Sequence, residues 1–319
     1  MSIALLLLVG LVLLYFGAEL LVKGAVALAR RMGVGPLVIG LTIVAFGTSM
    51  PEMTVSIQAA LSGSGDIAAA NVIGSNIFNV AFILGLAALI CPIRITAQIV
   101  KVDIPIMIGL SLLCIGLLHD RGLSRPEGLL LFAGIVAYTC FAFYLARRNP
   151  SDAVVHEAEE MLEKEKSDWL APSAGRAIGA VLAGLVLLVL GSKALVTGSI
   201  RLAQAIGLSE AVIGLTIVSA GTSLPELATS VVAAMRRQPD IAVGNVVGSN
   251  IFNILAILGT SSMLVPWSAP GITTVDLCVM LGIALLSLPF MWSRLTLSRL
   301  EGALLLFCYG LYLAWLWPK

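Results

Sequence analysis

The sequence predicts an all-α integral membrane protein whose ten transmembrane helices form two inverted five-helix repeats. Two observations predict this fold. First, 59% of the 319 residues are hydrophobic and only 12% are charged, whereas a soluble domain carries about 25% charged residues. Second, from Gly33 onward about 30 of 53 successive positions are identical to the residues 174 positions later. Self-similarity at a fixed offset indicates a duplicated unit.

Ten apolar segments are long enough to cross a bilayer as helices. A hydrocarbon core of about 30 Å needs about 20 apolar residues at a rise of about 1.5 Å per residue. Continuous runs of this kind exclude a β-barrel, whose strands alternate apolar and polar residues over short segments. The predicted spans are residues 2–29, 36–61, 67–90, 102–118, 128–146, 179–203, 211–235, 241–264, 275–291 and 302–317.

The offset of 174 residues extends over both halves of the chain. Gly17 recurs as Gly191 near the start of each half, and Glu127 recurs as Glu301 near its end. Because five is an odd number, the second unit must enter the membrane from the opposite side. Inverted repeats are typical of alternating-access transporters, which bind their substrate at the midplane between the halves. The predicted domains are a first repeat at residues 1–148, a linker at 149–174 and a second repeat at 175–319.

The basic residues predict the orientation of the chain. Of the 19 Lys and Arg, Lys23 and Lys193 lie inside predicted spans, and 17 lie near loops. Thirteen of these fall at one side of the spans, and only Arg121, Arg125, Arg201 and Lys319 fall at the other. Cytoplasmic loops carry the excess of Lys and Arg. Both termini are therefore expected outside the cytoplasm of a multi-pass inner-membrane protein, with the linker inside. The thirteen are Arg30, Arg31, Arg94, Lys101, Arg147, Arg148, Lys164, Lys166, Arg176, Arg236, Arg237, Arg294 and Arg299.

Two glutamates lie near the middle of predicted spans. Glu52 is in the second span and Glu226 in the seventh, and each follows the sequence Gly-Thr-Ser-x-Pro. An ionisable side chain at this depth costs at least about 2.5 kcal/mol, so a functional role is the first expectation. The alternative is a neutral packing residue, which would have to arise twice at equivalent places. Glu19 is the nearest other acid within a span, and Lys23 can pair with it one turn later.

Oxygen-bearing groups accompany both glutamates. Pro51 and Pro225 each remove a helix N–H, so each helix is expected to break just before its glutamate. Main-chain oxygens near Ala45 and Ser219 would then face a cavity, the only place where irregular backbone is tolerated at membrane depth. The other candidate ligands share mid-span positions and a spacing of one helical turn: Thr48 and Thr222 with the glutamates, and Ser75, Asn79, Ser249 and Asn253 on the third and eighth spans.

These candidates form the ligand set of a hard cation. All of them are oxygens, which suit Na⁺ or Ca²⁺, and no imidazole or thiolate is present to favour zinc or copper. Two carboxylates are neutralised by one Ca²⁺, or neutralised or slightly exceeded by two or three Na⁺, so the two ion sets would compete for one cage. Competition, with a barrier to moving the empty cage, predicts obligatory exchange. The remaining span asparagines are interpreted as packing or supporting residues: Asn71, Asn76, Asn245 and Asn250.

At this point the motifs resemble a known family. Gly-Thr-Ser-x-Pro-Glu at 47–52 and 221–226, with Gly-Ser-Asn-Ile-Phe-Asn at 74–79 and 248–253, resembles the cation/calcium exchanger superfamily and, within it, the prokaryotic sodium/calcium exchangers. The resemblance implies a Na⁺/Ca²⁺ antiporter whose outermost helices slide to alternate access. It implies ligands at Glu52, Glu226, Thr48, Thr222, Ser49, Ser223, Ser75, Ser249, Asn79 and Asn253, and at the main-chain oxygens of Ala45 and Ser219.

Potassium-dependent relatives carry aspartate at the position of Asn253, so no potassium requirement is implied here.

The sequence leaves three rival functions to weigh. A proton-coupled calcium exchanger using the same glutamates is the nearest rival, and Na⁺ dependence of the Ca²⁺ flux separates the two. A membrane enzyme is disfavoured because His119 and His156 lie outside the spans and no H-E-x-x-H or G-x-S-x-G pattern occurs. A passive channel would conduct without a counter-ion gradient. The expected partners are Na⁺, Ca²⁺ and the lipid bilayer, with no cofactor, nucleic acid or protein partner implied.

Overall fold

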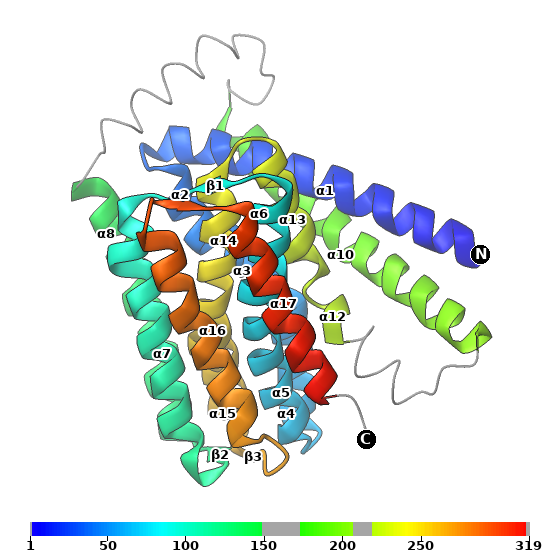
Figure 1. Cartoon of the computed structure of the whole chain (residues 1–319), viewed down its shortest axis with the longest axis vertical. Coiled ribbons are helices and arrows are strands. Elements are labelled where there is room, and N and C mark those ends of the chain that lie inside the picture. Colours follow the sequence, from blue (N-terminus) through cyan, green and yellow to red (C-terminus); the bar gives the residue numbers. More distant parts are fainter. Residues whose placement is uncertain (1, 149–172, 207–218, 317–319) are drawn as a thin grey trace.

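The computed structural model describes residues 2–148, 173–206 and 219–316, most of which are helical (Figure 1). π-Helical segments interrupt several spans. In the first half the elements are α1 (Ile3–Met32), α2 (Pro36–Ile39), η1 (Gly40–Val44), α3 (Ala45–Thr48), α4 (Met50–Leu61), α5 (Gly65–Ile77), η2 (Phe78–Leu84), α6 (Gly85–Ile90), β1 (Ile93–Arg94), η3 (Ile99–Asp103), α7 (Ile104–Leu117), η4 (Leu118–Asp120), β2 (Gly122–Leu123) and α8 (Arg125–Arg148). In the second half they are α10 (Ala174–Ala205), α12 (Ser219–Gly221), α13 (Leu224–Met235), α14 (Pro239–Phe252), η6 (Asn253–Leu258), α15 (Gly259–Leu264), β3 (Trp267–Ser268), α16 (Thr274–Trp292), β4 (Thr296–Leu297) and α17 (Arg299–Leu316).

Within the described ranges, eight helices are long and apolar enough to cross a membrane. A ninth candidate is a broken span, Pro36–Thr48 and Met50–Leu61, bent by 47°. The predicted seventh span, 211–235, begins outside the described residues, and its described part ends in the apolar helix α13 of 12 residues. Residues 149–172 of the predicted linker also lie outside the described residues. The eight helices that are long and apolar enough to cross a membrane are Ile3–Met32, Gly65–Ile90, Ile99–Asp120, Arg125–Arg148, Ala174–Ala205, Pro239–Leu264, Thr274–Trp292 and Arg299–Leu316.

Local sequence signals fix the ends of several helices. The Ser2 hydroxyl accepts the Leu5 N–H at 3.3 Å at the start of α1, and Gly33 ends that helix with φ 65°, a left-handed conformation that suits glycine. Glu127 accepts the Ser124 N–H at 2.8 Å before α8, and Glu301 accepts the Ser298 N–H at 2.7 Å before α17. These equivalent carboxylates therefore cap the last span of each half.

Two spans form the centre of the bundle. The most apolar window of Pro239–Leu264 is 100% buried and that of Gly65–Ile90 is 72% buried, whereas that of Arg299–Leu316 is only 11% buried. A helix that is apolar all round and buried is expected at the middle of a membrane bundle. The two central spans carry the Gly-Ser-Asn-Ile-Phe-Asn motifs, so both motifs lie inside the protein.

Helices α1 and α10 lie side by side and run obliquely away from the upright helices of the bundle, toward the right of Figure 1. Their contact is made by glycines seven residues apart on each helix. A Cβ atom added to Gly184 would lie 2.7 Å from the main-chain nitrogen of Leu21, so the two backbones are in direct contact. Small residues permit this close approach in membrane helices. The glycines are Gly10, Gly17 and Gly24 on α1 and Gly184, Gly191 and Gly198 on α10.

Two short antiparallel sheets join the halves at opposite ends of the bundle (Figure 1). At one end β1 pairs with β4, in the register Ile93 with Leu297. At the other end β2 pairs with β3, in the register Leu123 with Trp267. Each sheet thus takes one strand from each half of the chain.

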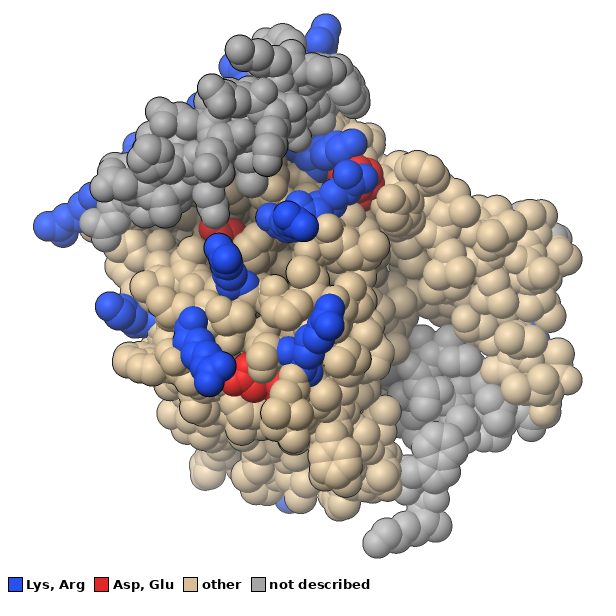
Figure 2. Space-filling view, turned by 45° about the horizontal axis from the view of Figure 1, so that its top comes forward, with Lys and Arg blue, Asp and Glu red and all other residues tan. Residues whose placement is uncertain are grey.

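Basic side chains gather over one end of the molecule, as Figure 2 shows. This end carries the last turns of α1, with Arg30 and Arg31, and of α8, with Arg147 and Arg148. Arg94 is exposed on β1 at the same end. All five belong to the thirteen basic residues that the sequence places on one side.

Candidate functional site

Both helices that carry the central glutamates break where the sequence predicts. In the first half α3 ends at Thr48 and α4 begins at Met50, so Glu52 lies in the first turn of α4. In the second half α12 ends at Gly221 and α13 begins at Leu224, so Glu226 lies in the first turn of α13. Both glutamates are 1% exposed. The predicted break before each glutamate is confirmed.

The two halves exchange hydrogen bonds at these glutamates. Ser49 Oγ donates to Glu226 Oε1 at 2.8 Å, and Ser223 Oγ donates to Glu52 Oε1 at 2.8 Å. Ser75 Oγ lies 3.2 Å from Ser223 Oγ. Because the single hydrogen of Ser223 is directed to Glu52, Ser75 is the donor in that contact. The structure therefore brings both Gly-Thr-Ser-x-Pro-Glu motifs and the third span to one place.

Several oxygen atoms of the predicted ligands are buried without a hydrogen-bond partner in the described part of the chain. A buried polar atom without a partner is rare in native proteins and needs an explanation, such as an ion. Four of them are carboxylate or amide oxygens, which only accept. They would suit a cation and could not be satisfied by apolar neighbours. The atoms are Glu52 Oε2, Glu226 Oε2, Asn79 Oδ1, Asn253 Oδ1 and the hydroxyl of Ser249.

The central asparagines lie where the spans change from α to π geometry. Asn79 is the second residue of η2 and Asn253 is the first residue of η6, and each is 1% exposed. π-Helical turns inside membrane spans are frequently found at functional sites. Ser75 and Ser249, one turn earlier, are also buried.

The two predicted threonines lie beside the glutamates of the opposite half. Thr48 is 1% exposed, and its Oγ1 lies 3.1 Å from both Val44 O and Asn245 Oδ1. Thr48 also interacts with Glu226, and Thr222 interacts with Glu52. Both threonines are thus part of the same cluster.

The prediction of a freed carbonyl is wrong for Ala45. Ala45 O accepts the Ser49 N–H at 3.0 Å, so it keeps its helical bond. A proline removes the partner of the carbonyl four residues earlier, which is Gly221 in the second half. Gly221 O instead accepts the hydroxyl of Ser192 from α10 at 2.6 Å. Thr48 Oγ1 also lies 3.4 Å from Ala45 O. The role of Ala45 as a ligand stays a prediction, as does that of Ser219, the first residue of α12.

Ser192 gives a testable asymmetry between the halves. The equivalent residue of the first half is Ala18, so comparing the repeats could not have revealed this contact. Ser192→Ala is expected to lower the free energy of unfolding by about 1–2 kcal/mol, because a buried carbonyl loses its donor. Thermal unfolding of the purified protein measures the change. Thr197→Ala is the control on the same helix, since its exposed hydroxyl only bonds Lys193 O, and a larger loss in that variant would contradict the assignment.

The supporting asparagines tie each glutamate to the next span. Asn71 Nδ2 donates to Glu52 O at 3.0 Å and to Ser56 Oγ at 2.9 Å. Asn245 Nδ2 makes the equivalent bonds, to Glu226 O at 3.3 Å and to Ser230 Oγ at 3.0 Å. Their interpretation as supporting residues agrees with these contacts.

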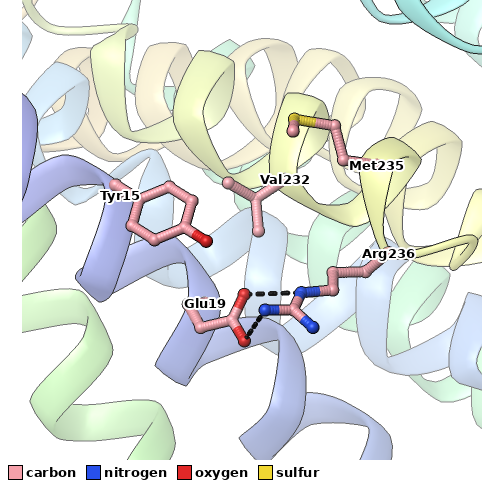
Figure 3. Close-up of a pocket in the computed structure, with 5 residues that line it drawn as sticks. All are labelled: Tyr15, Glu19, Val232, Met235 and Arg236. Carbon is pink, nitrogen blue, oxygen red and sulfur yellow. Dashed lines mark hydrogen bonds and ion pairs between the residues drawn. The ribbon is translucent and has the colours of Figure 1, made fainter.

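A second charged cluster lies away from the glutamate pair, between α1 and the end of α13 (Figure 3). The predicted pair is confirmed, with Lys23 Nζ 3.0 Å from Glu19 Oε1. The sequence did not predict Arg236, whose Nε donates to Glu19 Oε2 at 2.8 Å and whose terminal nitrogen contacts Glu19 Oε1. Glu19 and Arg236, with Tyr15, Val232 and Met235, line a cavity of about 220 Å³.

The comparisons with known proteins agree on one family. The family described as "Sodium/calcium exchanger protein" matches residues 2–145 and 176–317. The chain is 39% identical to the "Putative antiporter CaxA" of Alkalimonas amylolytica, over 95% of this chain and 94% of that protein. It is 34% identical to the "Sodium/calcium exchanger MaX1" of Methanosarcina acetivorans, over 97% of both. Among solved structures, the sodium-calcium exchanger NCX_Mj, soaked with 10 mM Na⁺ and 10 mM Sr²⁺, superposes with a TM-score of 0.82 at 31% identity, covering 98% of this chain and 97% of that one.

Proposed function

The chain belongs to the sodium/calcium exchanger protein family, and on that premise we propose that it exchanges Na⁺ for Ca²⁺ across the cell membrane by alternating access. Family membership supports an antiporter of cations including Ca²⁺. The identity of the counter-ion, the ligands and the orientation are proposed in addition.

One observation carries the proposal: two carboxylates from opposite halves are buried, and each has an oxygen without a hydrogen-bond partner in the described part of the chain, as do Asn79 and Asn253. A buried carboxylate either takes up a proton or needs a counter-charge, and in the described part of the chain no Lys or Arg forms an ion pair with either glutamate. A hard cation bound by oxygens meets that need. The proposed ligands are the side chains of Glu52, Glu226, Thr48, Thr222, Ser49, Ser223, Ser75, Ser249, Asn79 and Asn253, and the main-chain oxygens of Ala45 and Ser219.

The charge of the site supports exchange over simple binding. One Ca²⁺ balances both carboxylates, and two Na⁺ balance them equally well, so either ion set neutralises the site but both together would leave a buried excess of positive charge. Uncompensated charge is costly inside a membrane protein. Each ion set must therefore leave before the other enters. Together with a barrier to moving the empty site, this competition couples the two fluxes.

We further propose ten spans in two inverted repeats, with the seventh formed by residues 211–235. Equivalent contacts in the halves support the repeat: Tyr138 OH donates to Asp103 Oδ1 at 3.1 Å, and Tyr312 OH donates to Asp276 Oδ1 at 2.8 Å. The basic end of the molecule in Figure 2 supports a cytoplasmic position for that end. Both termini would then lie outside the cytoplasm, with the linker inside and the chain in the inner membrane.

The test is ⁴⁵Ca²⁺ uptake into proteoliposomes loaded with Na⁺. We expect rapid uptake driven by the outward Na⁺ gradient, and competitive inhibition by external Na⁺, because both ions use the same carboxylates. Vesicles loaded with K⁺, and vesicles carrying only a pH gradient, are the controls. Uptake that follows the pH gradient and ignores Na⁺ would assign the chain to the proton-coupled alternative. Ca²⁺ flux without any counter-ion gradient would indicate a channel.

A further inference from the structure

Asn76 and Asn250, the third residues of the two Gly-Ser-Asn-Ile-Phe-Asn motifs, bind each other's backbone across the two halves. Asn76 Nδ2 lies 3.4 Å from Asn250 O, and Asn250 Nδ2 lies 3.2 Å from Asn76 O. Each NH₂ group also faces a buried thioether, with Asn76 Nδ2 3.9 Å from Met280 Sδ and Asn250 Nδ2 3.5 Å from Met107 Sδ. Main-chain carbonyls and thioethers only accept hydrogen bonds. The NH₂ end of both side chains is therefore fixed, and the carbonyl end must point the other way.

The carbonyl ends of this pair meet the proposed ligand amides. Asn76 Oδ1 accepts Asn253 Nδ2 at 2.9 Å, and Asn250 Oδ1 accepts Asn79 Nδ2 at 3.0 Å. A carboxamide has its donor at one end and its acceptor at the other. Once the NH₂ of Asn253 or Asn79 is bound, its oxygen must face away from the asparagine pair. Those two oxygens are among the buried acceptors without partners.

We propose that Asn76 and Asn250 are positioning residues that make Asn79 and Asn253 present carbonyl oxygen, and not NH₂, to the transported cation. The inference rests on the proposed function of the site. Oxygen and nitrogen of a carboxamide have nearly the same size, so packing alone does not choose between the two orientations. A rotation of about 180° about the last torsion would replace a ligand with a donor that repels the ion. Two relays of amide contacts make the choice. Asn250 O orients Asn76, which orients Asn253, and Asn76 O orients Asn250, which orients Asn79.

This proposal makes the requirement for Asn76 depend on the residue at position 253. A carboxylate at 253 has acceptors at both ends and needs no orientation. With Asn253→Asp, the Asn76 amide would lose its partner donor and face a second acceptor instead. Removal of Asn76 should therefore weaken ion binding when residue 253 is asparagine, and should not weaken it when residue 253 is aspartate.

The experiment is a double-mutant cycle read by equilibrium ⁴⁵Ca²⁺ binding to the purified full-length protein, with Na⁺ as competitor. Asn76→Leu keeps the branching and the number of side-chain heavy atoms and removes both polar ends. We expect it to weaken Ca²⁺ binding about tenfold, the scale of a lost hydrogen bond to a ligand that holds an ion. Met280→Leu, which contacts the same NH₂ group, is the packing control and should change binding less than about twofold. In the Asn253→Asp background, Asn76→Leu should cause no weakening.

An equal tenfold loss in both backgrounds would overturn the proposal, because it would mean that Asn76 only packs the two central spans together. If Asn76→Leu does not give a monodisperse protein, the equivalent cycle of Asn250→Leu with Asn79→Asp applies the same test in the other half. The proposed function has its own readout. If the wild-type protein shows no Ca²⁺ binding with which Na⁺ competes, the proposed ion site is wrong. If the wild type binds Ca²⁺ in this way but the effects of the two substitutions are independent, only the positioning role is wrong.

Discussion

Replacing Glu52 by glutamine is expected to abolish Na⁺-driven Ca²⁺ uptake and to leave a folded protein. Glutamine keeps the shape of the side chain and can still accept the Ser223 hydroxyl, which bonds Glu52 at 2.8 Å. It removes one of the two charges that balance Ca²⁺. A pair of unit charges about 4 Å apart is worth about 4 kcal/mol at an effective dielectric constant of about 20. A loss of at least about 100-fold in the initial rate follows, measured by ⁴⁵Ca²⁺ uptake into proteoliposomes.

Glu226→Gln should behave in the same way, since Ser49 bonds Glu226 as Ser223 bonds Glu52. The matched control is Glu127→Gln. That carboxylate caps α8 by accepting the Ser124 N–H, a position where glutamine serves equally well. Its transport should equal that of the wild type. Retained Na⁺-driven uptake in both glutamine variants of the central pair would eliminate the assignment of the site.

The second large effect is expected at the contact between α1 and α10. Gly184→Leu places a side chain where a Cβ atom alone would lie 2.7 Å from the main-chain nitrogen of Leu21. Backbone atoms cannot move aside as a flexible side chain does, so the helices must separate and lose contact along their length. Overpacking of this kind costs about 3 kcal/mol. The expected result is a lower unfolding temperature of the purified protein, together with loss of uptake.

Gly179→Leu is the control for this variant on the same helix. A Cβ atom at Gly179 would meet nothing within 4 Å, so a larger side chain is accommodated there. Both variants add the same apolar group to α10 and differ only in what it contacts. Equal losses of stability at the two positions would show that leucine harms α10 itself, and the close contact with α1 would not be the cause.

The elements of the site were predictable from the sequence because each motif fixes its own helix. The prolines place a break before Glu52 and Glu226, and one-turn spacing puts Ser75 with Asn79. The pairing between halves was not predictable. Ser49 binds Glu226 and not the glutamate of its own motif, because the breaks of the two helices lie next to each other. Spacing along a chain carries no information about which copy of a repeated motif a side chain meets.

The positions of several spans were also predictable from the sequence. The predicted fourth span, 102–118, is the core of Ile99–Asp120, and the fifth, 128–146, lies within Arg125–Arg148. The π-helical segments, including η2 around Asn79, were not predicted, because this change of register follows from packing rather than from apolar periodicity. The strands were missed for another reason. A strand of two residues such as β1 is too short to show alternation.

The short sheets also affect how the chain is made. β1 ends at Arg94, but its partner β4 begins only at Thr296, so the two strands are synthesised at well-separated times. At about 5–20 residues per second, the ribosome needs roughly 10–40 seconds to synthesise the intervening chain. During that interval the first half is in the membrane with one edge of its loop unpaired. Completion of this sheet therefore waits until β4 has left the translocon, so a nascent chain truncated before Thr296 should be a substrate for membrane quality-control proteases.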